Sequence, residues 1–67
     1  MQKYQERVVK EKSELDEKLR NLLSFITAEG DSIFDKLNLD EKTRLTMQAR
    51  IMREYSDILD KRIKAFK

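Results

Sequence analysis

The sequence predicts an all-α protein in which two long antiparallel helices are joined by a short connecting helical turn. Three observations favour this fold. The chain has no Pro and a single Gly, its apolar residues recur at helical spacing on both sides of that Gly, and its β-branched residues never alternate over the length of a strand. We therefore expect one helical-hairpin domain over residues 1–67, with helices at about 4–27, 32–37 and 39–66.

The first helix is predicted from an apolar stripe along one face. At about 100° per residue this stripe contains Tyr4, Val8, Leu15, Leu19, Leu22 and Ile26, with Val9 and Leu23 at its margin. Gly30 suits the C-terminal cap of this helix, because glycine adopts the left-handed backbone conformation without steric cost. The helix should therefore end shortly before this glycine.

The connecting turn and the start of the second helix carry capping signals. Either Asp31 or Ser32 can cap a single helical turn, whose apolar residues we expect to plug the open end of the hairpin: Ile33, Phe34 and Leu37. Asn38, with Glu41 three residues later, resembles a capping box. Acidic residues begin the second helix and basic residues end it, as the helix dipole favours: Asp40 and Glu41, then Lys61, Arg62, Lys64 and Lys67.

The second helix carries more apolar surface than one partner helix can cover. One apolar stripe contains Met47, Ile51, Ile58 and Ala65, and the other contains Leu45, Met52, Leu59 and Ile63. A line of mixed character runs between them: Arg44, Gln48, Tyr55, Arg62 and Phe66. A hairpin covers one stripe, so we expect the other to pack in a homo-oligomeric helical bundle. The alternatives are a groove for a foreign amphipathic helix and contact with a membrane surface.

The composition argues against several classes of function. The chain has no Cys and no His, so disulfides, thiolate metal sites and the commonest general base are missing. There is also no Gly-rich phosphate loop and no recognisable pair of catalytic acids, so we expect no enzyme activity, no cofactor and no metal site. A chain of 67 residues buries only about 60% of the surface that it exposes when unfolded, which also favours self-association.

Charge and hydropathy limit the partners and the location. The net charge is +2, and acidic and basic residues are interleaved. The segment 43–67 holds seven Lys or Arg against three acids, but these charges are not confined to one face, so no stable nucleic-acid partner is expected. No apolar run is long enough to span a membrane, and the N-terminus does not resemble a signal peptide. We expect a cytoplasmic protein.

Two features of the sequence could bind an anion. Arg62 lies within an apolar face, where an unpaired charge is costly. It can pair with an acid of a neighbouring helix, extend to water at the helix end, or bind an anion in an oligomer interface. Along the flank of the first apolar stripe, helical spacing aligns Tyr4, Arg7, Glu11, Glu14 and Lys18. This line suits a nucleobase stacked on the ring with its phosphates held by the cations, or a ladder of ion pairs from Arg7 to Glu11 and from Glu14 to Lys18.

Two runs of the sequence resemble a family of small phage proteins. The first run is YQERVVKEK, which starts at Tyr4 and continues through residues 14–19 to Phe25 and Ile26. The second run combines Gln48, Met52, Tyr55, Ile58, Leu59, Arg62 and Ile63. In this order they are similar to the anti-CBASS cyclic-nucleotide sponges of tailed phages, and the resemblance spans nearly the whole chain.

The resemblance implies a helical protomer that assembles into a homohexamer and has no catalytic activity. Such proteins sequester the cyclic di- and trinucleotides that bacterial immune cyclases make, and so block anti-phage signalling in the host cytoplasm. For the dinucleotide, the resemblance implies Tyr4 as the stacking residue and Lys18 as a phosphate partner, contributed by two protomers, with Arg7 on the same flank. It implies Arg62, and also Arg53, as contacts of a separate trinucleotide pocket.

Two other functions compete with this interpretation. One is a helical oligomerisation or adaptor module that has no small-molecule ligand, and the other is a nucleic-acid-binding phage accessory protein. An adaptor would pair Arg62 with an acid and would not respond to cyclic nucleotides. Nucleic-acid binding would weaken steeply as the salt concentration rises.

Overall fold

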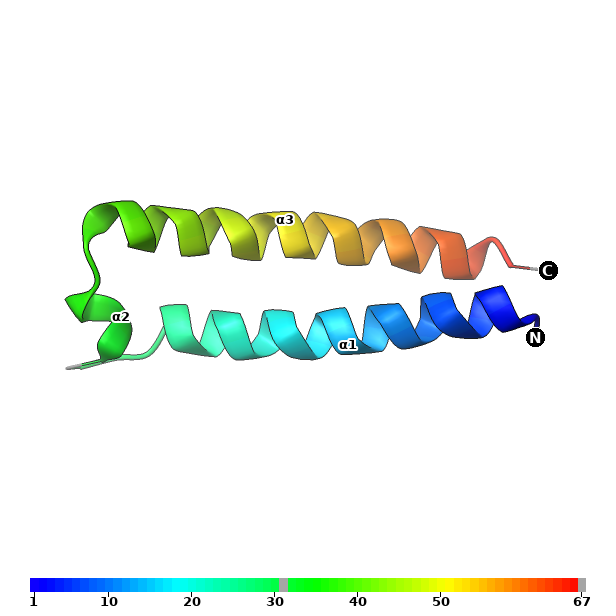
Figure 1. The fold of residues 1–67 in the computed structure, drawn as a ribbon, viewed down its shortest axis with the longest axis horizontal. Coiled ribbons are helices and arrows are strands. Elements are labelled where there is room, and N and C mark those ends of the chain that lie inside the picture. The colour runs from blue at the N-terminus through cyan, green and yellow to red at the C-terminus, as the bar shows by residue number, and fades with distance from the viewer. Residues whose placement is uncertain (31, 67) are drawn as a thin grey trace.

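The protein is a helical hairpin in the computed structural model, which describes residues 1–30 and 32–66. This part of the chain forms three helices, α1 (Lys3–Ile26), α2 (Ile33–Lys36) and α3 (Leu39–Lys64), and no strand. α1 and α3 lie antiparallel, with α2 at one end of the pair and both chain termini at the other (Figure 1). The prediction of an all-α fold with two long antiparallel helices is confirmed.

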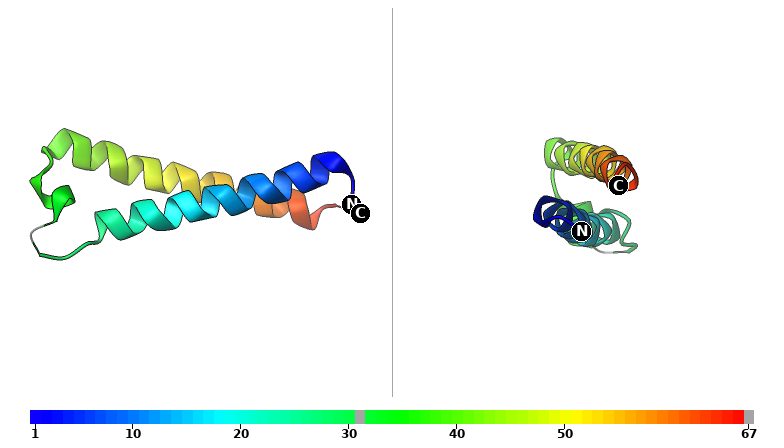
Figure 2. Two further views of the ribbon diagram at one scale, coloured as in Figure 1. Left: turned by 60° about the horizontal axis from the view of Figure 1, so that its bottom comes forward. Right: turned by 90° about the vertical axis from the view of Figure 1, so that its right-hand side faces the viewer.

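The two long helices form a slender rod. The described residues extend over 47 × 16 × 14 Å. Figure 2 shows the helices crossing each other in one view, and as a single pair when seen end-on. Each long helix therefore has one face against its partner and a wide outer surface that no other described segment covers.

α1 ends close to the predicted position but not at the predicted cap. Its C-cap is Thr27, whose backbone N–H and hydroxyl both donate to the Leu23 carbonyl oxygen, at 2.9 Å and 2.7 Å. Because Thr27 already satisfies this carbonyl, Gly30 is not the C-cap, and that prediction is wrong. Gly30 does adopt the left-handed conformation, with a φ of 78°, but it does so in the linker that leads to α2.

α2 is a single turn that closes one end of the hairpin. The Ser32 hydroxyl caps it by accepting a hydrogen bond from the backbone N–H three residues later, at 3.2 Å. The alternative cap, Asp31, lies outside the described residues. Phe34 and Leu37 are half-buried, and Phe34 packs edge to face on the phenylalanine ring of α1, with centroids 5.9 Å apart. Ile33 does not join this plug and is 69% exposed, because one helical turn cannot direct all its side chains toward α1.

α3 begins at Leu39 with half of the predicted capping box. The Asn38 side-chain oxygen accepts a hydrogen bond from the Glu41 backbone N–H at 2.8 Å. The reciprocal bond is replaced, because the Glu41 carboxylate accepts from Arg44 Nε at 2.9 Å. α3 ends at Lys64, two residues before the expected end.

The core is a thin line of apolar side chains between α1 and α3. Leu59 is fully buried, with 0% of its surface exposed, and Val8 and Ala49 are buried as well. The other members of this stripe of α3 are half-buried: Leu45, Met52 and Ile63. Since apolar burial is the main favourable term in folding, this stripe carries most of the hydrophobic stabilisation of the hairpin.

The other apolar stripe of α3 is turned away from α1. Met47, Ile51 and Ile58 are 46%, 55% and 54% exposed, and Ala65 is exposed too. We call these four residues the open stripe. A line of exposed apolar side chains is typical of a surface that packs against another molecule. The hairpin thus covers one stripe and leaves the other uncovered, as the sequence pattern indicates.

Replacing Leu59 by Ala should lower the free energy of unfolding by about 2–5 kcal/mol, because it leaves a cavity at the fully buried position. Chemical denaturation followed by circular dichroism measures this loss. Leu39→Ala is the matched control, since Leu39 is 76% exposed, and a change within about 0.5 kcal/mol is expected there. Similar losses in the two variants would contradict the assignment of the core to the Leu59 stripe.

Candidate functional site

α1 and α3 contact each other along two polar seams, one on each side of the core. On one side the Tyr55 hydroxyl donates a hydrogen bond to the Glu11 carboxylate. On the other side Ser56 bonds to Lys12 and Asp16. We call these the Tyr55 side and the Ser56 side of the hairpin.

The Tyr55 side gathers four of the five residues that the resemblance assigns to ligands. The hydrogen bond to Tyr55 places Glu11 on this side of α1, and neighbours at helical spacing share its flank. These neighbours are Tyr4, Arg7 and Lys18. Arg62 follows Tyr55 by seven residues, or about two helical turns, and so lies on the same side of α3. All four side chains are exposed.

These four residues do not form one compact cluster within a protomer. Tyr4 and Arg62 lie at the terminal end of the hairpin, where Tyr4 packs against Phe66 with ring centroids 5.9 Å apart. Arg7 lies one turn further along α1. Lys18 follows Tyr4 by 14 residues, which is about 21 Å along the helix at 1.5 Å per residue. One protomer therefore presents an aromatic ring with two arginines near its end, and a lysine nearer the middle of the rod.

The ion-pair ladder considered for this flank of α1 is not formed. Glu11 bonds across the seam to α3 rather than to Arg7. Glu14 lies 3.9 Å from Lys10 rather than pairing with Lys18. Among the described residues, Arg7 and Lys18 therefore have no ion-pair partner, and their charges are available to a ligand.

Arg62 also lacks an ion pair within the described part of the chain. The nearby acid of α3, Asp60, is 2.7 Å from Lys64. The hydrogen bond between them lowers the pKa of the Asp60 carboxyl and raises the pKa of the Lys64 amine. Asp60 precedes Arg62 by two residues and therefore points to another side of α3. Within residues 1–30 and 32–66, no acid forms an ion pair with Arg62 beside the open stripe.

Arg53, the fifth predicted contact, lies on the Ser56 side. It precedes Arg62 by nine residues, which is about half a turn of rotation at about 100° per residue, so one protomer does not bring the two arginines together. Arg53 and Arg50 border a hollow of about 220 Å³ whose other lining residues are Leu23, Ile26, Thr46 and Ala49. An apolar floor with two arginines at its edge suits a flat group that carries negative charge.

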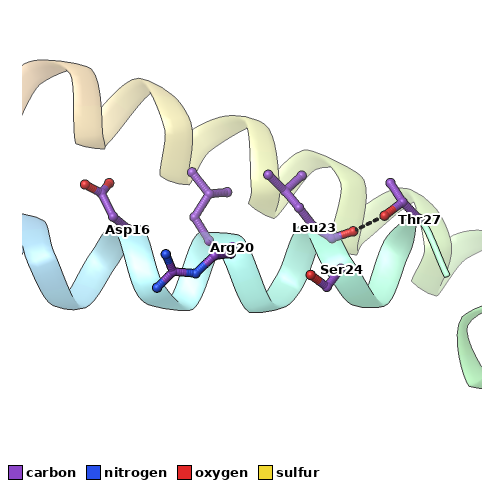
Figure 3. Close-up of a pocket in the computed structure, with 6 residues that line it drawn as sticks. Asp16, Arg20, Leu23, Ser24 and Thr27 are labelled. Carbon is purple, nitrogen blue, oxygen red and sulfur yellow. Dashed lines mark hydrogen bonds between the residues drawn. The ribbon is translucent and has the colours of Figure 1, made fainter.

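A second hollow, of about 410 Å³, lies along α1 on the Ser56 side. It is lined by Asp16, Leu19, Arg20, Leu23, Ser24 and Thr27, and Figure 3 shows the labelled side chains on successive turns of α1. Because both hollows include Leu23, they adjoin each other. Sequence reasoning missed Arg20 and Arg50, since single arginines on an exposed face form no recognisable pattern.

The Ser56 side is held by a cluster of three polar side chains. Lys12 Nζ lies 2.7 Å from Asp16 Oδ2 and 3.0 Å from Ser56 Oγ, and the Ser56 hydroxyl donates to the other Asp16 oxygen. The hydrogen bonds from Lys12 and then from Ser56 lower the pKa of the Asp16 carboxyl. Sequence reasoning missed this cluster, although the four-residue spacing of Lys12 and Asp16 favours their pairing.

A helical hairpin with an exposed aromatic ring, an open apolar stripe and cations that lack ion pairs within the described residues is typical of a small helical binding protein. The model of the Sequestin family matches residues 2–65. The chain belongs to this family, and the predicted family is confirmed, because the name fits the cyclic-nucleotide sponges that the sequence resembles. The name denotes sequestration, which indicates binding of a small molecule rather than catalysis. No match was found among curated proteins or among solved structures.

Residues 1–30 and 32–66 contain neither a metal-binding cluster nor a membrane-spanning helix. No cluster of three or more acidic, histidine or cysteine side chains is placed to hold a metal ion there. Within the same residues, no helix combines the length and the apolar character needed to cross a membrane. The features that remain for ligand binding are the exposed ring, the unpaired cations and the hollows.

Replacing Asp16 by Asn should destabilise the protein at neutral pH by up to about 1 kcal/mol, because a half-exposed charged hydrogen-bond cluster is lost. The pKa of Asp16 is lowered in the folded state from its ordinary value of 3.8. Its contribution is therefore present above that value and is lost as the pH falls through the lower, folded pKa. Unfolding free energies measured between pH 7 and pH 2 should converge for wild type and Asp16→Asn at acid pH.

Asp57→Asn is the control for this titration, because Asp57 is exposed and forms no ion pair with a described residue. Its stability curve should run close to that of the wild type at every pH. A curve for Asp16→Asn that stays parallel to the wild-type curve down to pH 2 would show that the cluster does not stabilise the charged carboxylate.

Proposed function

We propose that this protein binds and sequesters cyclic oligonucleotide second messengers, both cyclic dinucleotides and cyclic trinucleotides. By doing so it would block bacterial anti-phage immune signalling in the host cytoplasm. The observation that carries the proposal is an exposed Tyr4 ring beside arginines that form no ion pair with a described residue, in a chain of the Sequestin family. Sequestration needs tight binding and slow release, and it requires no catalytic group.

Tyr4 supplies the stacking surface in this proposal. Its side chain is 57% exposed, and stacking on an aromatic face contributes about 1–3 kcal/mol per base while accepting every base. Arg7 and Arg62 lie about one turn from the aromatic pair and supply charge to the phosphates. Guanidinium groups suit this role, because they can donate two parallel hydrogen bonds to one phosphate.

Lys18 serves the dinucleotide from a second protomer. A separation of about 21 Å along one helix disfavours contact of Lys18 and Tyr4 of the same chain with one small cyclic ligand. In a symmetric pair of protomers, each ligand can meet Tyr4 of one chain and Lys18 of the other, and the site is then repeated. The distance thus supports the contribution of two protomers that the resemblance implies.

The open stripe supports assembly into a homo-oligomer, which we propose to be a hexamer. Ile51 and Ile58 lie near Arg62 on the α3 surface, because Ile58 precedes it by four residues and Ile51 by eleven. A second copy packed over the stripe would remove these apolar side chains from water. It would also shield Arg62, and a charge in a less polar environment attracts phosphate more strongly.

The trinucleotide pocket is proposed to contain Arg62 and Arg53. These arginines lie on opposite sides of α3, so a shared pocket needs Arg62 of one protomer and Arg53 of another. The apolar hollow beside Arg53 and Arg50 offers a place for a base, with charge at its edge for the phosphates. This arrangement, like that of Lys18, depends on the oligomer.

The open stripe also favours one alternative function, a helical oligomerisation or adaptor module without a small-molecule ligand. An apolar stripe needs a protein partner whether or not a ligand binds. The alternative does not explain why Arg7, Lys18 and Arg62 lack ion pairs within the described residues. A nucleic-acid-binding role is less well supported, because exposed cations lie on both sides of the hairpin rather than along one stripe. Arg7, Lys18 and Arg62 lie on the Tyr55 side, and Arg50 and Arg53 border the hollow on the Ser56 side.

Cyclic di- and trinucleotides should raise the unfolding temperature of the wild-type oligomer. A ligand that binds only the folded form stabilises it by about 2.7 kcal/mol at a hundredfold excess over its dissociation constant. Tyr4→Ala should weaken dinucleotide binding by about tenfold or more while the mass in solution stays unchanged. Tyr4→Phe keeps the ring and is the matched control. If calorimetric titration shows unchanged dinucleotide affinity in Tyr4→Ala, the assigned site is wrong. If no cyclic nucleotide raises the unfolding temperature of the wild type, the adaptor module is the remaining function.

Replacing Ile51 and Ile58 together by Glu should dissociate the oligomer, because two charges would be buried in the proposed interface without partners. Light scattering should show the mass falling toward 8.1 kDa, the mass of one chain. The control is Ser13→Glu on the exposed outer surface of α1, which should keep the wild-type mass. An unchanged mass in the Ile51/Ile58 variant would show that the open stripe is not the oligomer interface.

A further inference from the structure

The terminal end of the hairpin is organised around one pair of aromatic rings. Tyr4 comes from the first turn of α1, and Phe66 follows the last turn of α3. Their ring centroids are 5.9 Å apart and their planes meet at 79°. Tyr4 is 57% exposed, whereas Phe66 is half-buried. Phe66, the less exposed of the two rings, therefore packs against the exposed Tyr4 ring.

The backbone of Phe66 is itself held in place. Its N–H donates to the Ile63 carbonyl oxygen at 3.1 Å. The preceding residue, Ala65, caps α3 and donates to the Lys61 carbonyl oxygen at 3.1 Å. The ring that contacts Tyr4 is thus anchored to the end of α3 rather than carried on a free terminus.

The Tyr4 ring has few other restraints. No hydrogen bond joins its hydroxyl to any described residue, and it lies in the first turn of α1, with solvent on the outer side. An edge-to-face contact restricts the tilt of both rings, while it covers at most one face of either. One face of Tyr4 is therefore left open in a defined orientation.

We propose that Phe66 is a positioning residue, which orients the Tyr4 ring so that its open face is ready to receive a nucleobase. This inference rests on the proposed function, because it assigns Phe66 a role in the same site. The benefit arises before binding. A ring that is already oriented loses less side-chain freedom when a base stacks on it, and the affinity rises accordingly.

The role differs from ordinary core packing, because it depends on the aromatic character of residue 66. An aliphatic side chain of similar size can fill the space beside Tyr4, but it lacks the ring edge and face that define a perpendicular contact. Phe66→Leu removes the aromatic contact and keeps an apolar side chain. Phe66→Tyr keeps the ring, and its added hydroxyl can reach solvent at the end of the rod.

The test compares these two variants in binding and in the environment of Tyr4. Phe66→Leu should weaken binding of a cyclic dinucleotide by about two- to tenfold, and Phe66→Tyr should restore it to within about twofold of wild type. The ring-proton resonances of Tyr4 should shift in Phe66→Leu, because the neighbouring ring current is lost. With two tyrosines in the chain, a Tyr55→Phe background identifies these resonances.

Three results would overturn the inference, and the Tyr4 resonances together with the binding affinity distinguish them. Unmoved Tyr4 resonances in Phe66→Leu would show that the two rings are not in contact. Moved resonances with wild-type affinity would show that the contact does not position the ring for the ligand. Absence of cyclic-nucleotide binding by the wild type would overturn the proposed function, and the positioning role with it. In the double variant Tyr4→Ala/Phe66→Leu, binding should be no weaker than in Tyr4→Ala alone.

Discussion

Two helices can bury only one face of each other, and α3 has two apolar faces. The face centred on Leu59 packs against α1, and the open stripe is left in water. A rod of these dimensions has no further element to cover it among the described residues. Burial of this stripe would need another molecule, and in the proposed oligomer stability, assembly and ligand binding would be linked. A core this small gives the single hairpin limited stability, and burial of the open stripe in an oligomer would add to it.

The polar seams settle how the two long helices are aligned. Tyr55 and Ser56 are consecutive residues, yet their side chains reach opposite sides of the core, where Glu11 and the Lys12–Asp16 pair receive them. Apolar packing alone tolerates sliding along the rod, whereas these directional bonds favour one register. The same bonds occupy Glu11, so it does not neutralise Arg7. The seam thus aligns the hairpin, and among the described residues Arg7 on the Tyr55 side has no ion-pair partner.

Sequence reasoning predicted the helices well because their signals are local. Apolar spacing, the Asn38 cap and the lack of Pro each act within a few residues, and the structure contains the helices that they predict. The prediction of a Gly30 cap was wrong because Thr27 donates hydrogen bonds to the Leu23 carbonyl oxygen and ends α1 earlier. Residue preferences for cap positions do not predict such a bond. The Arg7–Glu11 step of the ion-pair ladder failed for a tertiary reason, since Tyr55 of α3 bonds Glu11. The Glu14–Lys18 step failed within α1, because Glu14 lies nearer Lys10. The Lys12–Asp16–Ser56 cluster and the Tyr4–Phe66 contact were missed because each depends on the register of two distant segments.

The cations without ion-pair partners among the described residues would couple assembly to anion binding. An exposed arginine with an acid one turn away normally forms an ion pair within its own helix. Here Glu11, which lies one turn from Arg7, bonds to Tyr55, and α3 has no acid one turn before Arg62. Leaving cations without partners costs little while they are solvated, but it becomes unfavourable once a second copy covers the open stripe. A phosphate at that interface would restore the balance, so assembly and anion binding would favour each other. The proposed ligand-binding oligomer would thus use the same features that leave the open stripe of the single hairpin uncovered.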